Sequence, residues 1–565
     1  MDFKIEIAKL LDSKIESLNQ EEIFGLIEYP KNTEMGDFAF PCFRLAKEYR
    51  KAPPMIAGEL VEAIGQVEML ESVEAVGGYL NFKINKEVFA RTVLEGVLDM
   101  GDDYGKQTVG ENKKVIVEFS STNIAKPFHI GHIRSTMIGN SLNRIYKMLG
   151  YDTVAINHLG DYGTQFGKLI VAYKLWGSRE AIEKNPIPEL LKIYVKFHEE
   201  AEEKPELEDE ARAWFTKLEN DDKEAYELWS WFREVSLKEF NRVYSLLGVE
   251  FDSYDGESFY SDKMGAVLED MRNKNVMEVS EGAEIVNLEE YDMTPALITK
   301  KDGSSLYITR DLAAAIYRKN NYEFFKNIYV VGSQQKLHFS QLFKILELMG
   351  YAWSEDCTHV DFGMVSLAEG TMSTRKGRVV FLEEVLLKAI EEIKKVIDEK
   401  NPNLEGKEDV ARQVGVGAVV FQELFNNRIK DYTFSWEKAL SFEGETGPYV
   451  QYTHARACSV LRKADLDYKN EIDFSKLDDK ASMDLLRELA KFPKIIQDAG
   501  NKNEPSIITR YVVGIAQLFN RFYHDNPILT DDKELTKARL SLVYASKVTI
   551  KNGLYLVSIE APERM

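Results

Sequence analysis

The chain of 565 residues contains few cysteines and no long hydrophobic run. Its three cysteines, Cys42, Cys357 and Cys458, are far apart, so they form no pair with metal-site spacing. No apolar stretch approaches the roughly 20 residues that cross a bilayer. The amino terminus alternates charged and apolar residues, unlike a secretory signal. We therefore expect no membrane span and a reducing, cytoplasmic location.

Positive charge is also in short supply. Lysine and arginine number 72 against 93 aspartate and glutamate residues, which gives a net charge of −21. This balance argues against indiscriminate nucleic-acid binding but leaves room for a local basic face. The rest of the composition is that of a globular protein, with 44% hydrophobic residues, and the length implies several domains.

The most informative stretch, residues 115–149, reads as a strand, a loop and a helix. The strand is apolar and β-branched, the loop is polar with Pro127 near its end, and apolar residues then follow at helical spacing. A second apolar strand covers 153–156. This βαβ pattern predicts a parallel sheet whose ligands bind beyond the carboxyl ends of the strands.

The loop ends in His-Ile-Gly-His, residues 129–132, at the predicted first turn of the helix. His129 and His132 share one helix face, and the turn offers free N–H groups and partial positive charge that suit a phosphate. Both histidines could donate to phosphate oxygens in a transition state, and Gly131 leaves room for a ring or sugar. The alternative of two ordinary polar histidines is weaker because a strand, a proline-containing loop and a helix surround the motif.

The βαβ pattern is interrupted after residue 174 and resumes near residue 296. Residues 175–295 contain clustered aromatics typical of packed helices, and we interpret them as an insertion between two halves of a nucleotide-binding fold. Strands are predicted again at 296–300, 305–311, 327–332 and 360–365, with a helix from 312. Three cations in the glycine-flanked loop 370–378 suit a triphosphate, and an exposed basic turn is an equal alternative for that loop alone.

The two ends of the chain have their own character. The first residues read as a small α+β domain with two strands around Gly77-Gly78, and its aromatics are more typical of a core than of an RNA-stacking platform. From about 380 the chain is mostly helical. There Tyr449, Tyr452 and Arg456 share a helix face, where stacking on unpaired bases competes with core packing as their use.

Four motifs resemble those of class I aminoacyl-tRNA synthetases, most closely the arginyl family. They are residues 117–129 with the His-Ile-Gly-His loop, 372–377, 444–452 and 561–565, and the similarity covers essentially the whole chain. The resemblance implies an α/β protein: a split Rossmann catalytic domain with a helical insertion, an N-terminal α+β domain and an all-helical C-terminal anticodon-binding domain. The expected boundaries are 1–105 for the tRNA-contacting N-terminal domain, 106–174 and 296–395 for the Rossmann halves, 175–295 for the insertion, 396–445 for a helical junction and 446–565 for the anticodon domain.

The resemblance also implies an activity. It is the ATP-dependent attachment of L-arginine to its tRNA through arginyl-adenylate, with release of AMP and pyrophosphate. Arginyl enzymes activate their amino acid only when tRNA is bound. Mg²⁺ accompanies the ATP and no protein-bound metal is implied. The expected partners are the tRNA and L-arginine, with no membrane and with the chain as a monomer.

Site residues follow from the same resemblance. The catalytic set is His129, His132 and Lys126. A guanidinium prefers planar carboxylate partners, and the set expected to hold the guanidinium is Glu118, Tyr307 and Asp311. The α-amino and carboxylate end is assigned to Asn123 and Gln335. The ATP set is Gly131, Gly363, Met364, Val365, Met372, Ser373 and Lys376, and the anticodon set is Tyr449, Tyr452, Arg456 and Met565.

One departure from the family pattern concerns the second signature loop. Thr371 and Thr374 stand where most class I enzymes carry lysines. By resemblance Lys126 replaces the missing phosphate contact, and Lys376 is the competing candidate. Other classes left open are a glutamyl or cysteinyl synthetase, a small adenylyltransferase and a non-catalytic RNA-binding paralogue. The helical tail from 446 argues against the small adenylyltransferases, and Asp311 with Glu118 argues against an acidic substrate. The intact His129 and His132 argue against a non-catalytic paralogue.

Overall fold

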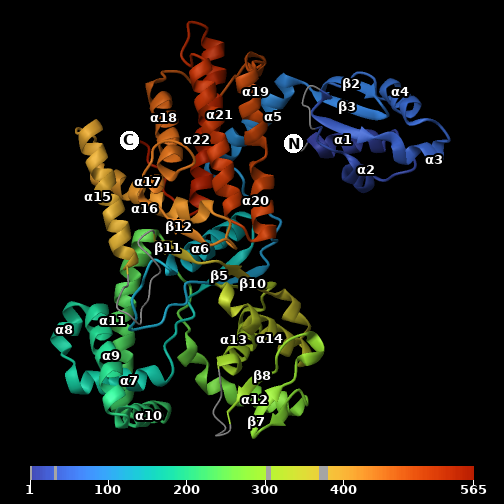
Figure 1. Cartoon of the computed structure of the whole chain (residues 1–565). Helices are drawn as coiled ribbons and strands as arrows, with labels where there is room; N and C mark the ends of the chain where they lie inside the picture. The colour runs from blue at the N-terminus through green and yellow to red at the C-terminus, as the bar shows by residue number, and fades with distance from the viewer. Residues whose placement is uncertain (1–2, 31–34, 301–306, 368–379) are drawn as a thin grey trace. The chain divides into compact units, whose positions relative to one another are not determined.

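The computed structural model describes residues 3–30, 35–300, 307–367 and 380–565 (Figure 1). The chain forms two compact units. Unit 1 combines Met1–Tyr104 with Ala457–Lys491 and Gly514–Thr549, and unit 2 combines Gly105–Arg456 with Phe492–Val513 and Ile550–Met565. The residues expected to form one anticodon-binding domain, 446–565, are therefore shared between the two units.

The amino-terminal part of unit 1 packs helices against a three-stranded antiparallel sheet of order β1-β3-β2. Gly77 and Gly78, between β2 and β3, adopt left-handed φ angles of 59° and 91°, as the predicted turn requires. Phe40 and Phe82 are fully buried, which confirms that aromatics of this part form a core. The elements are α1 (Phe3–Asp12), α2 (Gln20–Leu26), β1 (Phe38–Pro41), α3 (Ala46–Tyr49), α4 (Pro53–Ile64), β2 (Leu70–Val76), β3 (Tyr79–Ile84) and α5 (Lys86–Met100).

Unit 2 is built on a four-stranded parallel sheet of order β10-β9-β4-β5. The apolar strand interiors, such as Val115 to Val117, are completely buried, as expected of a sheet covered on both faces. Helix α6 connects β4 to β5, so the predicted βαβ unit and parallel sheet are confirmed. The elements are β4 (Lys114–Glu118), α6 (His132–Met148), β5 (Asp152–Ile156), β9 (Lys326–Gly332), α14 (Lys336–Leu348) and β10 (Cys357–Phe362).

Helix α6 is held against its surroundings by close packing and by a buried ion pair. A Cβ at Gly139 would lie 2.1 Å from Phe119, so only glycine allows this approach of α6 to the chain after β4. Arg134 of α6 donates its Nε–H to Glu423 of α16 (Lys407–Phe425) at 2.8 Å, and both side chains are at most 1% exposed. The hydroxyl of Tyr432 donates to the other oxygen of Glu423.

The insertion is mainly helical, as predicted, but it also contributes to a sheet. Its first helices are followed by an antiparallel sheet of order β6-β7-β8, which the sequence analysis did not predict. The acidic run 199–210 is mostly exposed on α9 and α10, as is usual for a solvated face. Helix α7 (Thr164–Trp176) leads into the insertion. The elements of the insertion are α8 (Arg179–Lys184), α9 (Pro186–Glu203), α10 (Glu206–Glu219), α11 (Lys223–Leu247), α12 (Met264–Asn273), β6 (Glu278–Ser280) and β7 (Ala283–Val286).

Of two predicted strands in the second Rossmann half, one is confirmed but lies in another sheet, and the other is wrong. Strand β8 (Ala296–Thr299) exists but pairs with β7 rather than with the parallel sheet, and the hydroxyl of Thr299 donates to Glu284 of β7. The described part of the predicted strand 305–311 is helical, because α13 spans Tyr307–Tyr322. Its buried Ile308, Leu312 and Ala315 recur every three or four residues, and this helical period outweighs the β-branched residues at its start.

The remaining elements are mostly helical. Strand β11 (Val365–Leu367) pairs in parallel with β12 (Tyr432–Phe434) next to α16 and α17 (Trp436–Ala439). No helix in the described ranges is both long and apolar enough to span a membrane. The other helices are α15 (Leu382–Lys400), α18 (Gly447–Lys463), α19 (Lys480–Ala490), α20 (Phe492–Lys502), α21 (Ser506–Asp525) and α22 (Lys533–Leu556).

Candidate active site

The loop between β4 and α6 has an unusual backbone. Ser120, Ser121 and Ala125 all adopt positive φ angles, of 69°, 45° and 59°. Such conformations are costly for residues other than glycine and persist only when the surroundings hold them. Here the Ser120 hydroxyl bonds to Tyr244 of α11, and the Ala125 N–H donates to Ser236 of the same helix. The insertion therefore fixes the course of the loop that leads to the histidines.

The two histidines at the end of this loop are held in one defined tautomer. The backbone N–H of Gly131 donates to Nδ1 of His129, and that of His129 donates to Nδ1 of His132, each at 3.1 Å. An Nδ1 that accepts a hydrogen bond leaves the proton of a neutral imidazole on Nε2. Burial lowers the pKa of His129 and, together with the charge of His129, lowers the pKa of His132 to about 3. Both rings are neutral Nε2–H donors at neutral pH.

The start of α6 departs in one respect from the prediction of free N–H groups. Gly131 donates to His129 as described, and the N–H groups of His132 and Ile133 donate to the carbonyls of His129 and Ile130 at 2.9 and 3.0 Å. These three donors are therefore engaged within the turn itself. The imidazole Nε2–H groups and the helix dipole remain as the features of this turn that favour an anion.

A second cluster of charges lies beside the loop. Arg310 of α13 pairs with Glu257 at 2.8 Å, and its guanidinium lies 5.0 Å from the ring of Tyr162 and 5.4 Å from that of Tyr307. Burial raises the pKa of Glu257 to about 7 although Arg310 opposes the change. Burial lowers the pKa of Lys126, and the charge of Glu257 opposes this shift. Glu257 thus lies between the loop cation and helix α13.

Asp311, the next residue of α13, faces two histidines. Nε2 of His338 on α14 lies 2.6 Å from one carboxylate oxygen, and Nε2 of His158 lies 3.9 Å from the other. Burial acts to raise the pKa of Asp311, but the hydrogen bond and charge of His338 outweigh it, so the pKa is lowered. Gln335 is exposed in the turn just before α14. Asp311 is therefore a carboxylate that stays ionised in a partly enclosed setting.

Glu118 lies at the end of β4 and has a partner within the chain. Arg318 of α13 approaches its carboxylate at 2.6 Å, and the Arg318 side chain is completely buried. The positive charge of Arg318 is thus matched by Glu118, which is itself buried. Because Asp311 and Arg318 are seven residues apart on α13, they share one helix face, and Glu118 meets that face. A guanidinium ligand at Glu118 would share the carboxylate with Arg318.

Two further substrate candidates lie at the surface of this region. Tyr307 is exposed at the first turn of α13. Asn123 is exposed in the loop and forms a parallel bridge with Gly160, where a Cβ would lie 2.2 Å from the Asn123 amide oxygen. This contact explains why position 160, in the loop after β5, is a glycine.

The predicted ATP residues that follow β10 are held in place by contacts with Asp431. The N–H of Met364 donates to Asp431 at 2.6 Å, and a Cβ at Gly363 would lie 2.5 Å from the same carboxylate. Met364 is exposed and Val365 is buried in β11. Arg134 of α6 donates to the Lys430 carbonyl at 2.8 Å and to the Met364 carbonyl at 3.5 Å, and the second bond ties this segment to α6. Met372, Ser373 and Lys376 lie outside the described residues, as do Thr371 and Thr374.

Three of the four predicted anticodon residues lie on helix α18. Tyr452 is 42% exposed, and the guanidinium of Arg456 lies 4.8 Å from its ring, while Tyr449 is partly buried. Met565 packs, partly buried, against the apolar cluster between α15 and α16. The exposed pair Tyr452–Arg456 has the composition of a stacking surface for a base.

Several residues of the site were missed by the sequence analysis. Buried Asp161 accepts hydrogen bonds from Ser258 and forms an ion pair with Arg233 of α11. It therefore joins the insertion to the sheet. Glu257 and His338 were missed as well, because their partners lie more than twenty residues away in sequence. All three residues stand in mixed polar segments without a recognisable motif, so the sequence offered no signal for them. None of the described residues form a cluster of three or more histidine, cysteine or acidic side chains able to hold a metal.

Comparison with known protein families divides the chain into three matched regions. Residues 94–436 match the catalytic domain model of tRNA synthetases class I (R). Residues 450–565 match the DALR anticodon binding domain, and residues 5–84 match the arginyl tRNA synthetase N terminal domain.

Individual relatives agree with these matches over their full length. The chain is 63% identical to an arginine–tRNA ligase of Clostridioides difficile and 59% identical to one of Halothermothrix orenii, with 100% of each chain covered. The solved structure of Thermus thermophilus arginyl-tRNA synthetase superposes with a TM-score of 0.81 at 25% identity, covering 100% of this chain and 99% of that one. The geometry of the histidine loop, the parallel sheet and these matches together place the chain in the arginyl family of class I tRNA synthetases.

Proposed function

We propose that this site joins L-arginine to its tRNA in two steps. In the first, the carboxylate of arginine attacks the α-phosphate of ATP, and pyrophosphate leaves. In the second, the terminal hydroxyl of the tRNA attacks the arginyl carbonyl, and AMP leaves. The observation that carries the proposal is the pair of neutral histidines fixed as Nε2–H donors at the start of α6.

The histidines act on the phosphates. Charge on the phosphate oxygens grows as the α-phosphorus becomes pentacovalent, and donors already in place stabilise that charge without reorganisation. A neutral donor does this without trapping ATP in its ground state as strongly as a full cation would. Gly131, Gly363, Met364 and Val365 contribute the backbone surface for the nucleotide, together with Met372, Ser373 and Lys376 of the signature loop.

Specificity for arginine rests on the acidic groups facing α13. Asp311 is ionised and partly enclosed, and Tyr307 precedes it by one helical turn. The guanidinium of the substrate pairs with Asp311, with Glu118 and Tyr307 completing the recognition of its planar group. Asn123 and Gln335 hold the α-amino and carboxylate end.

Lys126 supplies the cation that the signature loop lacks. Its ammonium is partly buried just before the histidine loop, and no acidic group in the described chain forms an ion pair with it. A cation without a fixed partner is available to the phosphates of ATP. Mg²⁺ would accompany ATP, since it commonly keeps water and substrate phosphate ligands, and it would supply further positive charge at the phosphates beside Lys126.

The tRNA also contacts the protein at places remote from the reacting groups. Tyr452 stacks on an anticodon base with Arg456 adding a cation contact, and Tyr449 and Met565 border the same region. The N-terminal domain, residues 1–105, contacts the outer corner of the tRNA. The protein works as a monomer in the cytoplasm.

Pyrophosphate exchange with each amino acid in turn, with and without tRNA, tests the proposal. Exchange dependent on arginine and on tRNA is the expected result. Exchange supported by glutamate or cysteine would assign the site to another synthetase, and no exchange with any amino acid would favour a non-catalytic RNA-binding protein. In the active case, the product released with tRNA present is AMP.

A further inference from the structure

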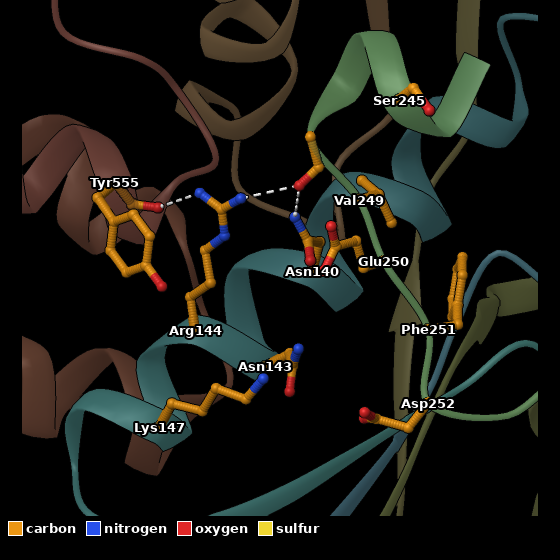
Figure 2. A pocket seen from close by; sticks show the side chains of 11 residues that line it. Asn140, Asn143, Arg144, Lys147, Ser245, Val249, Glu250, Phe251, Asp252 and Tyr555 are labelled. Carbon is orange, nitrogen blue, oxygen red and sulfur yellow. Dashed lines mark hydrogen bonds between the residues drawn. The ribbon is translucent and has the colours of Figure 1, made fainter. Parts of the chain in front are cut away.

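Unit 2 contains a polar pocket beside the second half of α6 that the proposed reaction does not use. Its volume is about 490 Å³, within the usual range for small-molecule sites. One wall is the last three turns of α6, the opposite wall is the segment 248–252 that follows α11, and Tyr555 closes one end (Figure 2). We call it the α6 pocket.

The frame of the α6 pocket is rigidly tied. The guanidinium of Arg144 donates to the carbonyls of Tyr555 and Gly248, each at 2.8 Å, and lies 4.6 Å from the Tyr555 ring. Asn140, one turn earlier, donates to Ser558. Arg144 is thus engaged with the protein itself, so its role is to hold the two walls and the end of the pocket together.

The other charged groups of the pocket have no ion-pair partner among the described residues. Lys147, Glu250 and Asp252 form no ion pair with any residue in the described ranges, although Asp252 accepts one backbone N–H, from Ala155. Figure 2 shows the charged ends of Lys147 and Asp252 entering the space from opposite walls. Asn143 lines the wall between them, is only 5% exposed, and its amide oxygen has no hydrogen-bond partner among the described residues.

A buried amide oxygen without a partner costs free energy that a bound donor would recover. Arg144 also lines the pocket, and its charge interacts with that of Glu250, but its hydrogen bonds go to backbone carbonyls. The groups left without an ion-pair partner are two carboxylates and one ammonium, beside the amide oxygen of Asn143. A ligand that pairs with each of these charged groups carries two cationic groups and one carboxylate. Phe251 and Val249 add apolar surface along the same wall for an aliphatic stem.

We propose that the α6 pocket is a second small-molecule site that binds a basic α-amino acid. The ligand carboxylate pairs with Lys147, and its two cationic groups pair with Glu250 and Asp252, with a donor to Asn143. This inference does not rest on the proposed reaction, because none of these residues belongs to the catalytic or arginine-binding set. A nucleotide phosphate fits less well because the two free carboxylates would repel it.

L-Lysine is the probe of choice, since it has the required charges and is not the substrate of the proposed reaction. Equilibrium dialysis with radiolabelled L-lysine on the full chain should find one saturable site. Glu250→Gln combined with Asp252→Asn should weaken it at least tenfold, as expected for lost charge-assisted hydrogen bonds. The matched control removes two exposed acidic groups elsewhere, Glu199→Gln with Glu210→Gln, and should leave binding unchanged. Asp311→Asn should also leave it unchanged.

Ligand and lysine variants test the polarity of the site. Norleucine, which lacks the side-chain cation, and cadaverine, which lacks the carboxylate, should each bind at least tenfold more weakly than L-lysine. Lys147→Met should weaken L-lysine and leave cadaverine unaffected. The proposal is overturned if no saturable L-lysine site exists, if norleucine binds equally well, or if the Glu250–Asp252 variant retains full binding. Loss of L-lysine binding in Asp311→Asn would place the ligand in the arginine pocket and equally overturn it.

Discussion

Replacing Lys126 by methionine isolates the charge that we assign to phosphate binding. Methionine keeps the aliphatic stem and removes the ammonium. A contact that strengthens as charge develops affects turnover more than ATP affinity. Loss of one such donor costs about 10²–10³-fold in rate, or about 2.7–4 kcal/mol. We therefore expect adenylate formation to slow by that factor while the KM for ATP changes little.

The same substitution should leave the fold intact. Burial lowers the pKa of Lys126, which means that its cationic form is disfavoured where it lies. Removing that charge should therefore change the free energy of unfolding by no more than about 0.5 kcal/mol. Thermal unfolding of both proteins checks this point and separates a catalytic loss from a folding loss.

Single-turnover formation of arginyl-adenylate with tRNA present is the appropriate assay, because it is not limited by product release. Lys376→Ala is the matched comparison and should have the smaller effect. Thr374→Lys restores a cation at the usual family position and should partly rescue Lys126→Met. A near wild-type Lys126→Met enzyme together with an inactive Lys376→Ala enzyme would refute the assignment and transfer the role to Lys376.

Four further predictions concern other parts of the molecule. Asp311→Asn should raise the KM for arginine by a factor equivalent to about 2–5 kcal/mol with little change for ATP, and an unchanged value in steady-state kinetics would remove Asp311 from the pocket. Because the pKa of folded Glu257, about 7, lies above its usual 4.5, the folded state binds the proton more tightly and stability from this group is lost as pH rises through 7. The melting temperature should thus fall between about pH 4.5 and 7 and level off above that range, with a smaller fall in Glu257→Gln; equal slopes in the two proteins would contradict the shift. Tyr452→Ala should weaken tRNA binding by about 1–3 kcal/mol in a filter assay, whereas lower thermal stability with unchanged affinity would assign Tyr452 to packing. ATP–pyrophosphate exchange with arginine should require tRNA, and strong exchange without it would exclude a tRNA-dependent first step.

The local pattern of the sequence predicted the centre of the fold well. The strand β4, the loop and α6 were correctly placed because hydrophobic period and proline position act over a few residues. The partner of a strand is not encoded so locally, and β8 was therefore assigned to the wrong sheet. Tyr307 to Asp311 was read as a strand because Ile308 and Thr309 are β-branched, although the buried face repeats every three or four residues.

Only part of the candidate site could be predicted from the sequence, for a related reason. The histidine loop could be read because its residues are consecutive. The partners that adjust its surroundings come from remote segments: Arg318 reaches Glu118, His338 reaches Asp311, and Arg310 reaches Glu257. Nothing in the spacing of these residues predicts such pairs, because they depend on how α13 and α14 pack in the completed fold.

The ion pair between Arg134 and Glu423 has a consequence for how this chain can change over evolutionary time. Both side chains are almost fully withdrawn from water, and Tyr432 engages the second oxygen of Glu423. Replacing either residue alone would leave a buried charge unmatched, at a cost of about 3–5 kcal/mol. Replacing both by well-packed apolar residues carries far less cost. The two positions are therefore expected to change together, through a poorly tolerated intermediate, while the exposed acidic face of the insertion is free to vary one residue at a time.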